Sequence, residues 1–210
     1  MYRQRPPRSA AQRVAFAIVA VLTVALGYYL GNRIGGSGVQ VPSSPEELIA
    51  AGEPVDLADL TLIDYYGQPF GGEQFAGRWS LLAFTHPDDV EQTRKALTRL
   101  VLVHNRLVDH PKLQKAFRGL VVALDPLGDP TALRELLDID SPDFIGLSVE
   151  PERLARLAPE GGRDAPAEAL AEALALVDPQ RRLVGWFAPD VTPAAVAADL
   201  KSLARAASAH

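Results

Sequence analysis

The chain has 210 residues, which is enough for one domain of ordinary size together with a tail or a membrane anchor. Apolar residues make up 48% and charged residues 22%, a balance that predicts a packed core and not a disordered chain. The sequence contains no cysteine, and its single methionine is Met1. Disulfides, thiol catalysis, zinc–thiolate sites and iron–sulfur clusters are therefore excluded.

The formal net charge of -5 is unevenly distributed along the sequence. Residues 1–33 contain five arginines and no acidic residue, so the rest of the chain carries 16 basic and 26 acidic side chains. An acidic body without a basic stripe argues against nucleic-acid binding, because that function needs clustered lysine and arginine to displace counterions. We therefore expect no nucleic-acid partner.

Residues 14–30, VAFAIVAVLTVALGYYL, form an uncharged apolar segment that would span ~25 Å as a helix. Arginines precede it, and Tyr28 and Tyr29 lie where an interfacial aromatic belt is expected. This pattern predicts an uncleaved transmembrane anchor, with residues 1–13 in the cytoplasm and the acidic body outside. A cleaved signal peptide fits less well because LGYYLGNRIGG offers no clear cleavage site. A buried core helix is also disfavoured, since the segment has no polar face.

Residues 31–54 follow the predicted anchor and are predicted to be a flexible linker with at most one short helical turn. Residues 55–207 then form the predicted folded body. Because the N-terminus resembles a bacterial signal anchor, we expect the chain in a bacterial inner membrane with its body in the periplasm. A mitochondrial inner membrane is the alternative.

Strand and helix patterns alternate in the first half of the body. Residues 60–70 predict a strand and a turn, and the apolar segment 79–84 predicts a central strand buried on both faces. A helix is predicted next, with Pro87 in its first turn and Pro111 ending the pattern. Its apolar stripe consists of Leu97, Leu100, Val101, His104, Leu107 and Val108.

The second half of the body continues the alternation. Residues 119–124 predict a second buried strand, and residues 128–139 predict a capped helix. Residues 141–158 predict an extended piece and a short helix. A hairpin is predicted over 173–187 and an amphipathic terminal helix over 192–207. This order predicts a central sheet with helices on both faces.

Taken in order, these segments resemble the Sco/SenC family of membrane-anchored, thioredoxin-like proteins, which help deliver copper to cytochrome c oxidase. The resemblance covers most of residues 55–205. Its most specific parts are FTH at 84–86, LDPLGDP at 124–130 and LVDPQRRLVGWF at 176–187. It implies an α/β fold with a thioredoxin-like central sheet flanked by helices, preceded by one N-terminal transmembrane helix.

The family's copper chemistry depends on two cysteines four residues apart just after FTH, and on a histidine nine residues before the proline of the late DP turn. The corresponding positions in this chain are Pro87, Glu91 and Leu170. Cu(I) is a soft ion that prefers thiolate or thioether sulfur, and none of these side chains supplies it. The resemblance therefore implies a degenerate member without the family's metal ligands, without a cofactor and without a catalytic residue.

The segment after FTH offers one alternative ligand set, which consists of His86, Asp88, Asp89 and Glu91. One imidazole and three carboxylates could hold Cu(II), zinc or a hard cation loosely, but not Cu(I) with the preference of a thiolate site. The other interpretation is that the acids complement the dipole of the helix in its first turn, and that His86 is a cap or an outward loop residue. We favour the second interpretation because acidic residues are common in a first helical turn.

The remaining histidines and aromatic residues give weaker signals. His104 lies on the predicted apolar stripe and is expected to be half-buried, and His110 is expected at a helix end. Trp186 and Phe187 end the predicted hairpin. We expect them in the core, as is usual for aromatic residues in strands, and one exposed aromatic available to a partner is the alternative.

Three functional hypotheses follow from the sequence. The first is a membrane-anchored, extracytoplasmic interaction or assembly factor linked to cytochrome c oxidase biogenesis. Its partner would be an oxidase subunit, an assembly factor or a true copper chaperone. The second is a metallochaperone that binds copper through non-sulfur ligands near His86 and Glu91. The third is a thiol-independent enzyme, which no residue pattern supports, so we expect no enzyme activity.

Overall fold

The computed structural model describes residues 45–86, 88–124, 141–149 and 173–208. These residues belong to one compact unit, which comprises Val41–His210. No helix in this described part of the chain is both long and apolar enough to cross a membrane.

Three predicted helices fall on residues outside the described part. They are the transmembrane anchor at 14–30, the capped helix at 128–139 and the short helix beginning near Pro151. The described fold is therefore that of the body.

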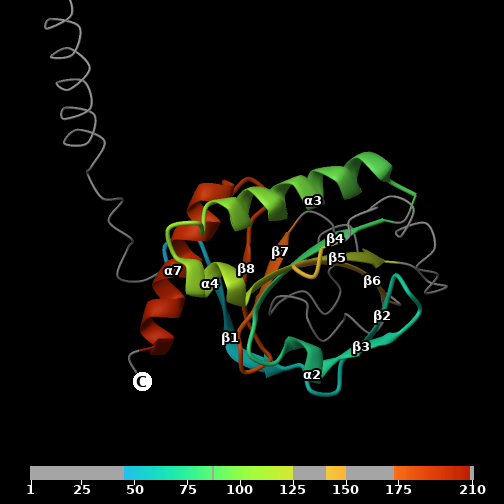
Figure 1. The fold of residues 1–210 in the computed structure, drawn as a ribbon, viewed down its shortest axis with the longest axis horizontal. Helices are drawn as coiled ribbons and strands as arrows, with labels where there is room; N and C mark the ends of the chain where they lie inside the picture. The colour runs from blue at the N-terminus through green and yellow to red at the C-terminus, as the bar shows by residue number, and fades with distance from the viewer. Residues whose placement is uncertain (1–44, 87, 125–140, 150–172, 209–210) are drawn as a thin grey trace, which may run out of the picture. The chain divides into compact units, whose positions relative to one another are not determined.

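An eight-stranded mixed sheet forms the centre of the body, with strand order β1-β8-β7-β4-β5-β6-β2-β3 (Figure 1). The strands are β1 (Ile49–Asp56), β2 (Thr61–Asp64), β3 (Pro69–Gly71), β4 (Trp79–Thr85), β5 (Phe117–Leu124), β6 (Phe144–Val149), β7 (Leu174–Val177) and β8 (Arg182–Phe187). Strands β4, β5 and β6 are parallel, and β7 pairs with β4 in the antiparallel direction. The predicted α/β class with a central sheet is confirmed.

The two central strands are those with the most continuous apolar sequences. Every residue of β4 is buried, and β5 is buried at all positions except Arg118. Parallel strands with both faces covered read as unbroken apolar segments, which is why the sequence predicted both of them. They pair in register, with Leu82 opposite Leu120.

Three helices cover one face of this sheet (Figure 1). The helices of the described part are α2 (Gly72–Phe75), α3 (Val90–Asn105), α4 (Pro111–Ala116) and α7 (Pro193–Ser208). Leu100 of α3, Leu113 of α4 and Leu200 of α7 pack in one cluster with Leu81 and Phe117. Helices were predicted on both faces of the sheet. Among the described residues, the other face is covered by one helix, the four-residue α2.

The second face of the sheet, to which Leu62 of β2 and Phe70 of β3 contribute, packs against α2. Phe75 of α2 lies in a cluster with Phe84, Leu120 and Trp186, and its ring meets that of Phe70 edge-on at 5.1 Å between centroids. Trp186 is 4% exposed.

Phe187 is fully buried in the cluster on the helical face. Strand β8 lies between β1 and β7, so neither Trp186 nor Phe187 reaches solvent to any useful extent. The core prediction for the two aromatic residues is confirmed, and the alternative of an exposed aromatic is wrong.

Strand β1 begins inside the segment that the sequence predicted as a linker, residues 31–54. It pairs in the antiparallel direction with β8 at the edge of the sheet. The linker prediction is therefore wrong for residues 49–54. Most side chains of β1 are exposed, so the strand lacks the alternation of apolar residues by which sequence analysis finds strands. Gly185 of β8 permits the pairing, since a Cβ there would lie 2.5 Å from the carbonyl oxygen of Ile49.

A buried carboxylate on α7 holds the chain that enters β1. Asp199 is 1% exposed, and its two oxygens accept hydrogen bonds from the backbone N–H groups of Glu46, Glu47 and Leu48 at 2.8–2.9 Å. A buried carboxylate needs such donors to offset the loss of its hydration. This contact joins residues more than 150 positions apart, and sequence periodicity carries no signal for it.

Helix α3 is shorter than the sequence predicted. It begins at Val90 with Asp89 as its N-cap, so Pro87 precedes the helix and does not lie in its first turn. It ends at Asn105, and a further helix, α4, begins at Pro111, where the sequence predicted only a stop. Val108, placed on the apolar stripe by its spacing, lies between the two helices and is 70% exposed.

Of the two histidines of this region, His104 lies where the sequence predicted it, and His110 lies at the start of α4 and not at the end of α3. His104 is half-buried between the rings of Phe117 and Phe144, at centroid distances of 5.8 and 5.6 Å. His110 is the N-cap residue of α4. Both serve the packing and connection of the helices.

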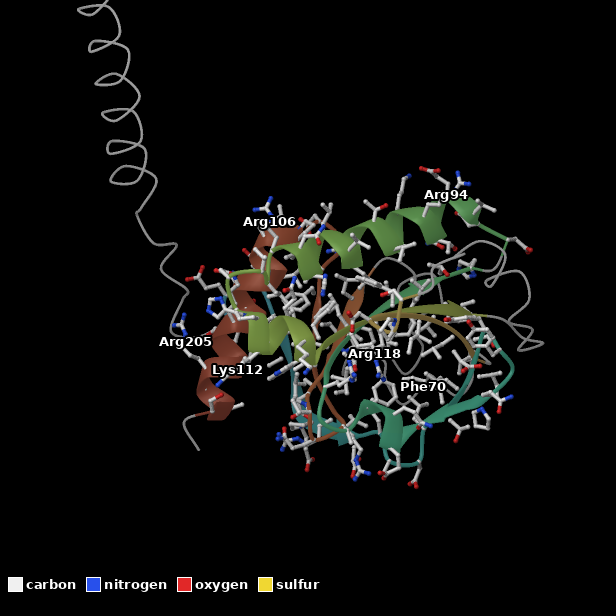
Figure 2. The ribbon with its side chains drawn as sticks, viewed as in Figure 1. Phe70, Arg94, Arg106, Lys112, Arg118 and Arg205 are labelled. Carbon is white, nitrogen blue, oxygen red and sulfur yellow. The ribbon has the colours of Figure 1, made fainter. Side chains whose placement is uncertain are left out.

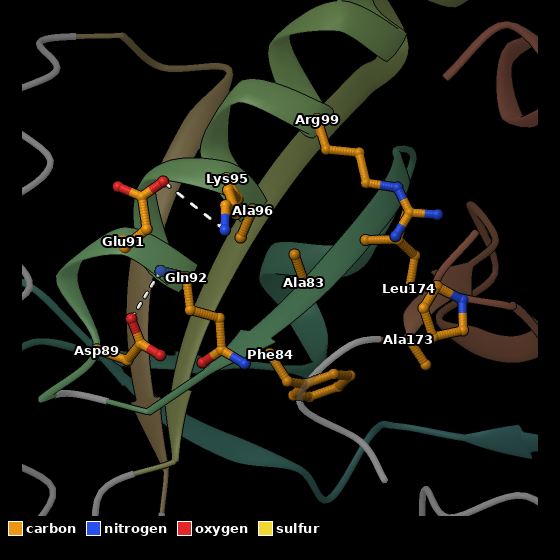
Figure 3. Close-up of a pocket in the computed structure, with 11 residues that line it drawn as sticks. Ala83, Phe84, Asp89, Glu91, Gln92, Lys95, Ala96, Arg99, Ala173 and Leu174 are labelled. Atoms are coloured by element: carbon orange, nitrogen blue, oxygen red, sulfur yellow. Dashed lines mark hydrogen bonds and ion pairs between the residues drawn. The ribbon is translucent and has the colours of Figure 1, made fainter. Parts of the chain in front are cut away.

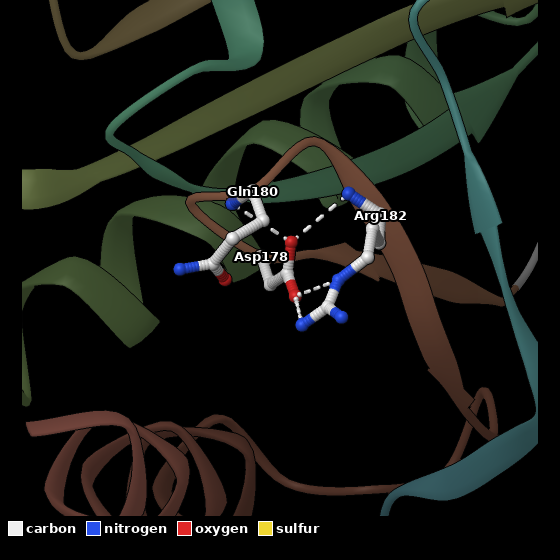
Figure 4. A network of polar contacts seen from close by, with 3 residues as sticks. All are labelled: Asp178, Gln180 and Arg182. Atoms are coloured by element: carbon white, nitrogen blue, oxygen red, sulfur yellow. Dashed lines mark hydrogen bonds and ion pairs between the residues drawn. The ribbon is translucent and has the colours of Figure 1, made fainter. Parts of the chain in front are cut away.

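The hairpin predicted over 173–187 is formed by β7 and β8. Asp178 organises its turn (Figure 4). Its Oδ1 accepts hydrogen bonds from the backbone N–H groups of Gln180 and Arg182, each at 2.9 Å. Its Oδ2 accepts from Nε and Nη2 of Arg182 at 2.8 and 2.6 Å. These bonds hold the turn in which Arg181 adopts a positive φ of 68°.

Candidate functional site

The loop that corresponds to the family's metal loop leaves the end of β4 and enters α3. His86 is half-buried directly after β4. Its backbone N–H donates to Oε1 of Gln92 at 3.0 Å, and its carbonyl oxygen accepts from the N–H of Asp89 at 3.1 Å. These two backbone hydrogen bonds of His86 therefore connect the loop to the N-cap and the first turn of α3.

Asp89 acts as the N-cap of α3. Its Oδ1 accepts a hydrogen bond from the backbone N–H of Gln92 at 2.8 Å, and its carbonyl oxygen accepts from the hydroxyl of Thr93 at 3.0 Å. An N-cap carboxylate satisfies one of the N–H groups that has no partner within the helix and complements the positive end of the helix dipole. Asp89 therefore complements the helix dipole as the sequence suggested, but from the N-cap position and not from the first turn.

The other two carboxylates of the loop point to solvent. Asp88 is exposed, and Glu91 lies in the first turn with its side chain 69% exposed. Glu91 forms an ion pair with Lys95 at 3.7 Å, one turn further along the helix. Such an exposed pair contributes only about 0.3 kcal/mol to the free energy of unfolding.

A cavity of about 470 Å³ lies beside this loop (Figure 3). It is bounded by the start of α3, the end of β4 and the start of β7, and its apolar wall includes Phe84 and Leu174. Its polar lining residues are Asp89, Glu91, Gln92, Lys95 and Arg99. Most of these polar groups already serve the helix start or an ion pair along it.

Arg99 is the cation at the inner side of this cavity. Its Nη2 donates hydrogen bonds to the carbonyl oxygens of Ala188 and Val191 at 3.0 and 2.8 Å. Burial lowers the pKa of the Arg99 guanidinium, and the charge of Asp190 opposes that shift. The guanidinium thereby ties α3 to the segment between β8 and α7.

The residues of this loop do not fit a copper ion. The whole sequence contains no cysteine and no methionine after Met1, so Cu(I) has no thiolate or thioether ligand here. Within the residues that the structure describes, no group of three or more histidine, aspartate or glutamate side chains could hold a metal ion. Of the alternative set, Asp89 is committed to its cap and Glu91 faces solvent.

Two of the three family ligand positions lie outside the described residues. They are Pro87 and Leu170, and Glu91 is the only one whose side chain can be placed.

A family model described as SCO1/SenC matches residues 53–205. The chain belongs to the SCO1/SenC family. It is a degenerate member, because it lacks the two cysteines and the histidine of the family's metal site. No curated protein matches the sequence.

Solved structures share the fold of this SCO1/SenC domain. Yeast Sco1 with copper bound has 19% identity and a TM-score of 0.54, and the alignment covers 76% of this chain and 94% of that one. Arabidopsis thaliana ScoI with copper bound has 16% identity, a TM-score of 0.55 and coverage of 74% and 99%. Apo Sco1 from Thermus thermophilus has 26% identity, a TM-score of 0.54 and coverage of 75% and 96%.

Two residues of the site, Gln92 and Arg99, were not predicted from the sequence. Gln92 follows Asp89 by three positions, and that spacing of an N-cap residue and a glutamine is a recognised signal for a helix start. Arg99 carried no signal, because the carbonyl groups that it binds lie about 90 residues later in the sequence.

Proposed function

We propose that this SCO1/SenC chain is a membrane-anchored, extracytoplasmic assembly or interaction factor for cytochrome c oxidase biogenesis. Its thioredoxin-like domain binds a protein partner and neither carries copper nor exchanges thiols. One structure similar in fold is that of BsSco, described as a member of the Sco family of cytochrome c oxidase assembly proteins, at 15% identity and a TM-score of 0.54. That description supports a role in cytochrome c oxidase assembly. The absence of sulfur ligands in this chain supports a role without copper binding or thiol exchange.

The observation that carries this proposal is the local use of the metal loop. A loop that retains its place between β4 and α3 but uses Asp89 as a cap and contains no sulfur keeps the scaffold without the metal chemistry. A shared fold does not imply a shared activity, because function depends on the residues of the site. Without the metal ligands, what the domain shares with its family is the scaffold, and we propose that this scaffold is recognised by a protein partner. No specific observation favours the metallochaperone alternative near His86 and Glu91.

The membrane location is part of the proposal. Residues 14–30 would anchor the chain in a bacterial inner membrane, with the N-terminus in the cytoplasm and the domain in the periplasm. Their support is the length and charge pattern of the sequence. An alkaline phosphatase fused to the C-terminus should be active only if the domain is exported, and an inactive fusion in intact cells would contradict this topology.

The test of the function compares partner binding with copper binding in the full-length chain. Purified from membranes in mild detergent, the chain should retain a stoichiometric oxidase subunit or assembly factor and should bind no Cu(I) against a chelator of high affinity. A variant with Pro87→Cys, Glu91→Cys and Leu170→His, which restores the family ligand types, is the matched control for the copper assay. Cu(I) bound one-to-one by the wild-type chain, or purification without any such partner, would contradict the proposal.

A further inference from the structure

Most basic side chains of the described part lie on one face. Residues 90–116 and 193–208, which contain α3, α4 and α7, hold eight lysines and arginines and three acidic residues. The other described residues hold four lysines and arginines and twelve acidic residues. Figure 2 shows Arg94 and Arg205 projecting outward from α3 and α7, and Arg106 projecting outward directly after the end of α3. The described body is acidic overall, as expected, but the sequence did not predict a basic excess on one face, because these charges come from helices that are separate in sequence.

A groove of about 670 Å³ opens on this basic face, between α4 and the C-terminal half of α7. It lies at the start of β4, whereas the metal loop follows the end of that strand. Its apolar lining includes Trp79, Leu113 and Ala204. Three cations also line it, namely Lys112 and Arg205, which are exposed, and Lys201, which is half-buried. The groove thus combines an apolar floor with a positively charged edge.

One of these three cations has a partner within the domain, and the other two have none among the described residues. The Lys201 ammonium contacts the two carboxylate oxygens of Asp109 at 2.7 and 2.9 Å, and the hydrogen bond from Lys201 lowers the pKa of that carboxyl. Lys112 and Arg205 are exposed and form no ion pair or hydrogen bond within the described ranges. An acidic group that entered the groove would find these two cations unpaired within the described ranges, whereas Asp109, the carboxylate that also lines the groove, is already paired with Lys201.

We infer that this groove binds an acidic segment of a partner protein. An apolar side chain of that segment would pack over Trp79 and Leu113, and its carboxylates would pair with Lys112 and Arg205. This inference rests on the proposed function, because it specifies the surface and the chemistry of the partner that the proposed function requires. Charge complementarity of this kind gives specificity and faster association in addition to affinity.

The shape of the site favours a protein segment over an anionic membrane surface. The side chain of Lys201 is only 12% exposed and lies in the wall of the groove. A side chain that inserts into the groove can reach it, but a flat layer of lipid headgroups cannot. An apolar floor inside a concave site is also typical of an anchor residue that becomes buried on binding.

The experiment uses photo-crosslinking in the full-length chain in the membranes of the cells that produce it. Benzoylphenylalanine replaces Ala207, an exposed residue that lines the groove, and in a parallel strain it replaces Thr98, which is exposed on α3. The crosslinked peptide is identified by mass spectrometry. We expect capture at position 207 of a protein segment rich in aspartate and glutamate, and little capture of that segment at position 98.

Charge reversal then tests the two free cations. Lys112→Glu combined with Arg205→Glu should reduce capture of the acidic segment at position 207 at least about tenfold, and raised salt should reduce it in the wild-type chain as well. Arg94→Glu combined with Lys115→Glu is the matched control, since it changes the net charge equally at exposed residues outside the groove. Capture in the control should stay within about twofold of wild type.

Each other outcome overturns the inference in a recognisable way. Capture that is unchanged by the groove reversal, a captured segment without acidic residues, a second copy of the chain, or adducts with lipid alone would each contradict the acidic protein segment. If an oxidase partner co-purifies with the full-length chain while the groove crosslinks to nothing, the groove inference fails and the proposed function stands. If no partner co-purifies at all, the proposed function fails and the inference fails with it.

Discussion

The loop before α3 and the groove between α4 and α7 use their charged residues in opposite ways. In the loop, Asp89 caps the helix and Glu91 pairs with Lys95, so these charges are committed to local structure. At the groove, Lys112 and Arg205 have no partner in the described part of the chain. The place where the family keeps its metal site has thus become an ordinary helix start, while the free charge lies at the other end of β4.

The largest expected effect concerns the helix that carries the groove. Asp199→Ala should lower the free energy of unfolding by about 3 kcal/mol, because the backbone N–H groups of residues 46–48 lose their common buried acceptor. Denaturant unfolding of the full-length chain in detergent measures this. Amide exchange should then rise first in β1 and α7 and not at the start of α3.

Glu53→Ala is the control for that variant. Glu53 is exposed on β1, the strand that Asp199 secures, and its loss should change stability by less than about 0.5 kcal/mol. Equal stability of the Asp199 and Glu53 variants would show that the groove helix is held by other contacts.

A smaller effect is expected at the metal loop. Asp89→Ala should destabilise the domain by about 1 kcal/mol through loss of the N-cap, and Asp88→Ala, one residue earlier and exposed, should have almost no effect. Thermal or denaturant unfolding of the two variants in parallel gives the comparison. If the two variants were equally stable, or if Asp88 mattered more, the loop would not be the simple helix start described above.

The ion pair at the edge of the groove predicts a pH dependence. The pKa of Asp109 is lowered in the folded state, first by its hydrogen bond from Lys201, so its contribution is present above the unfolded pKa of about 4 and is lost as pH falls through the folded value. Asp109→Asn should cost less than about 1 kcal/mol at neutral pH, because the carboxyl is largely exposed. The difference from wild type should disappear in acid, and a difference that grows in acid would contradict the assigned pair.

The smallest effect is expected for Glu91→Gln. The exposed pair with Lys95 is worth about 0.3 kcal/mol, and screening by salt should remove that difference. Unfolding at low and high salt tests this. A loss above about 1 kcal/mol, or one that persists at high salt, would show that the carboxylate at the second family position has a role other than a surface ion pair.

The sheet centre and the terminal helix could be predicted because their residues follow simple periodicities. Strands β4 and β5 are continuous apolar segments, and α7 has one apolar face. Strand β1 and helix α4 could not be predicted in this way. The strand is held by backbone pairing and by Asp199, and the helix has only six residues behind a proline that also reads as a stop.

The candidate site was predictable in its chemistry but not in its geometry. Residue types alone showed that thiolate ligands are absent, and the acids before α3 predicted a helix start. The basic face was hidden, because its charges belong to three helices that tertiary packing brings to one side of the sheet. The net charge of the chain does not indicate how charged side chains are distributed between the faces of the fold.

The most direct measurement is a Cu(I) competition titration of the full-length chain with a chromophoric chelator of high affinity, performed beside the variant that restores cysteine at positions 87 and 91 and histidine at position 170. Because the wild-type sequence offers no soft ligand after Met1, it should leave the chelator fully loaded at every protein concentration. Removal of one equivalent of Cu(I) from the chelator by the wild-type chain would contradict the account.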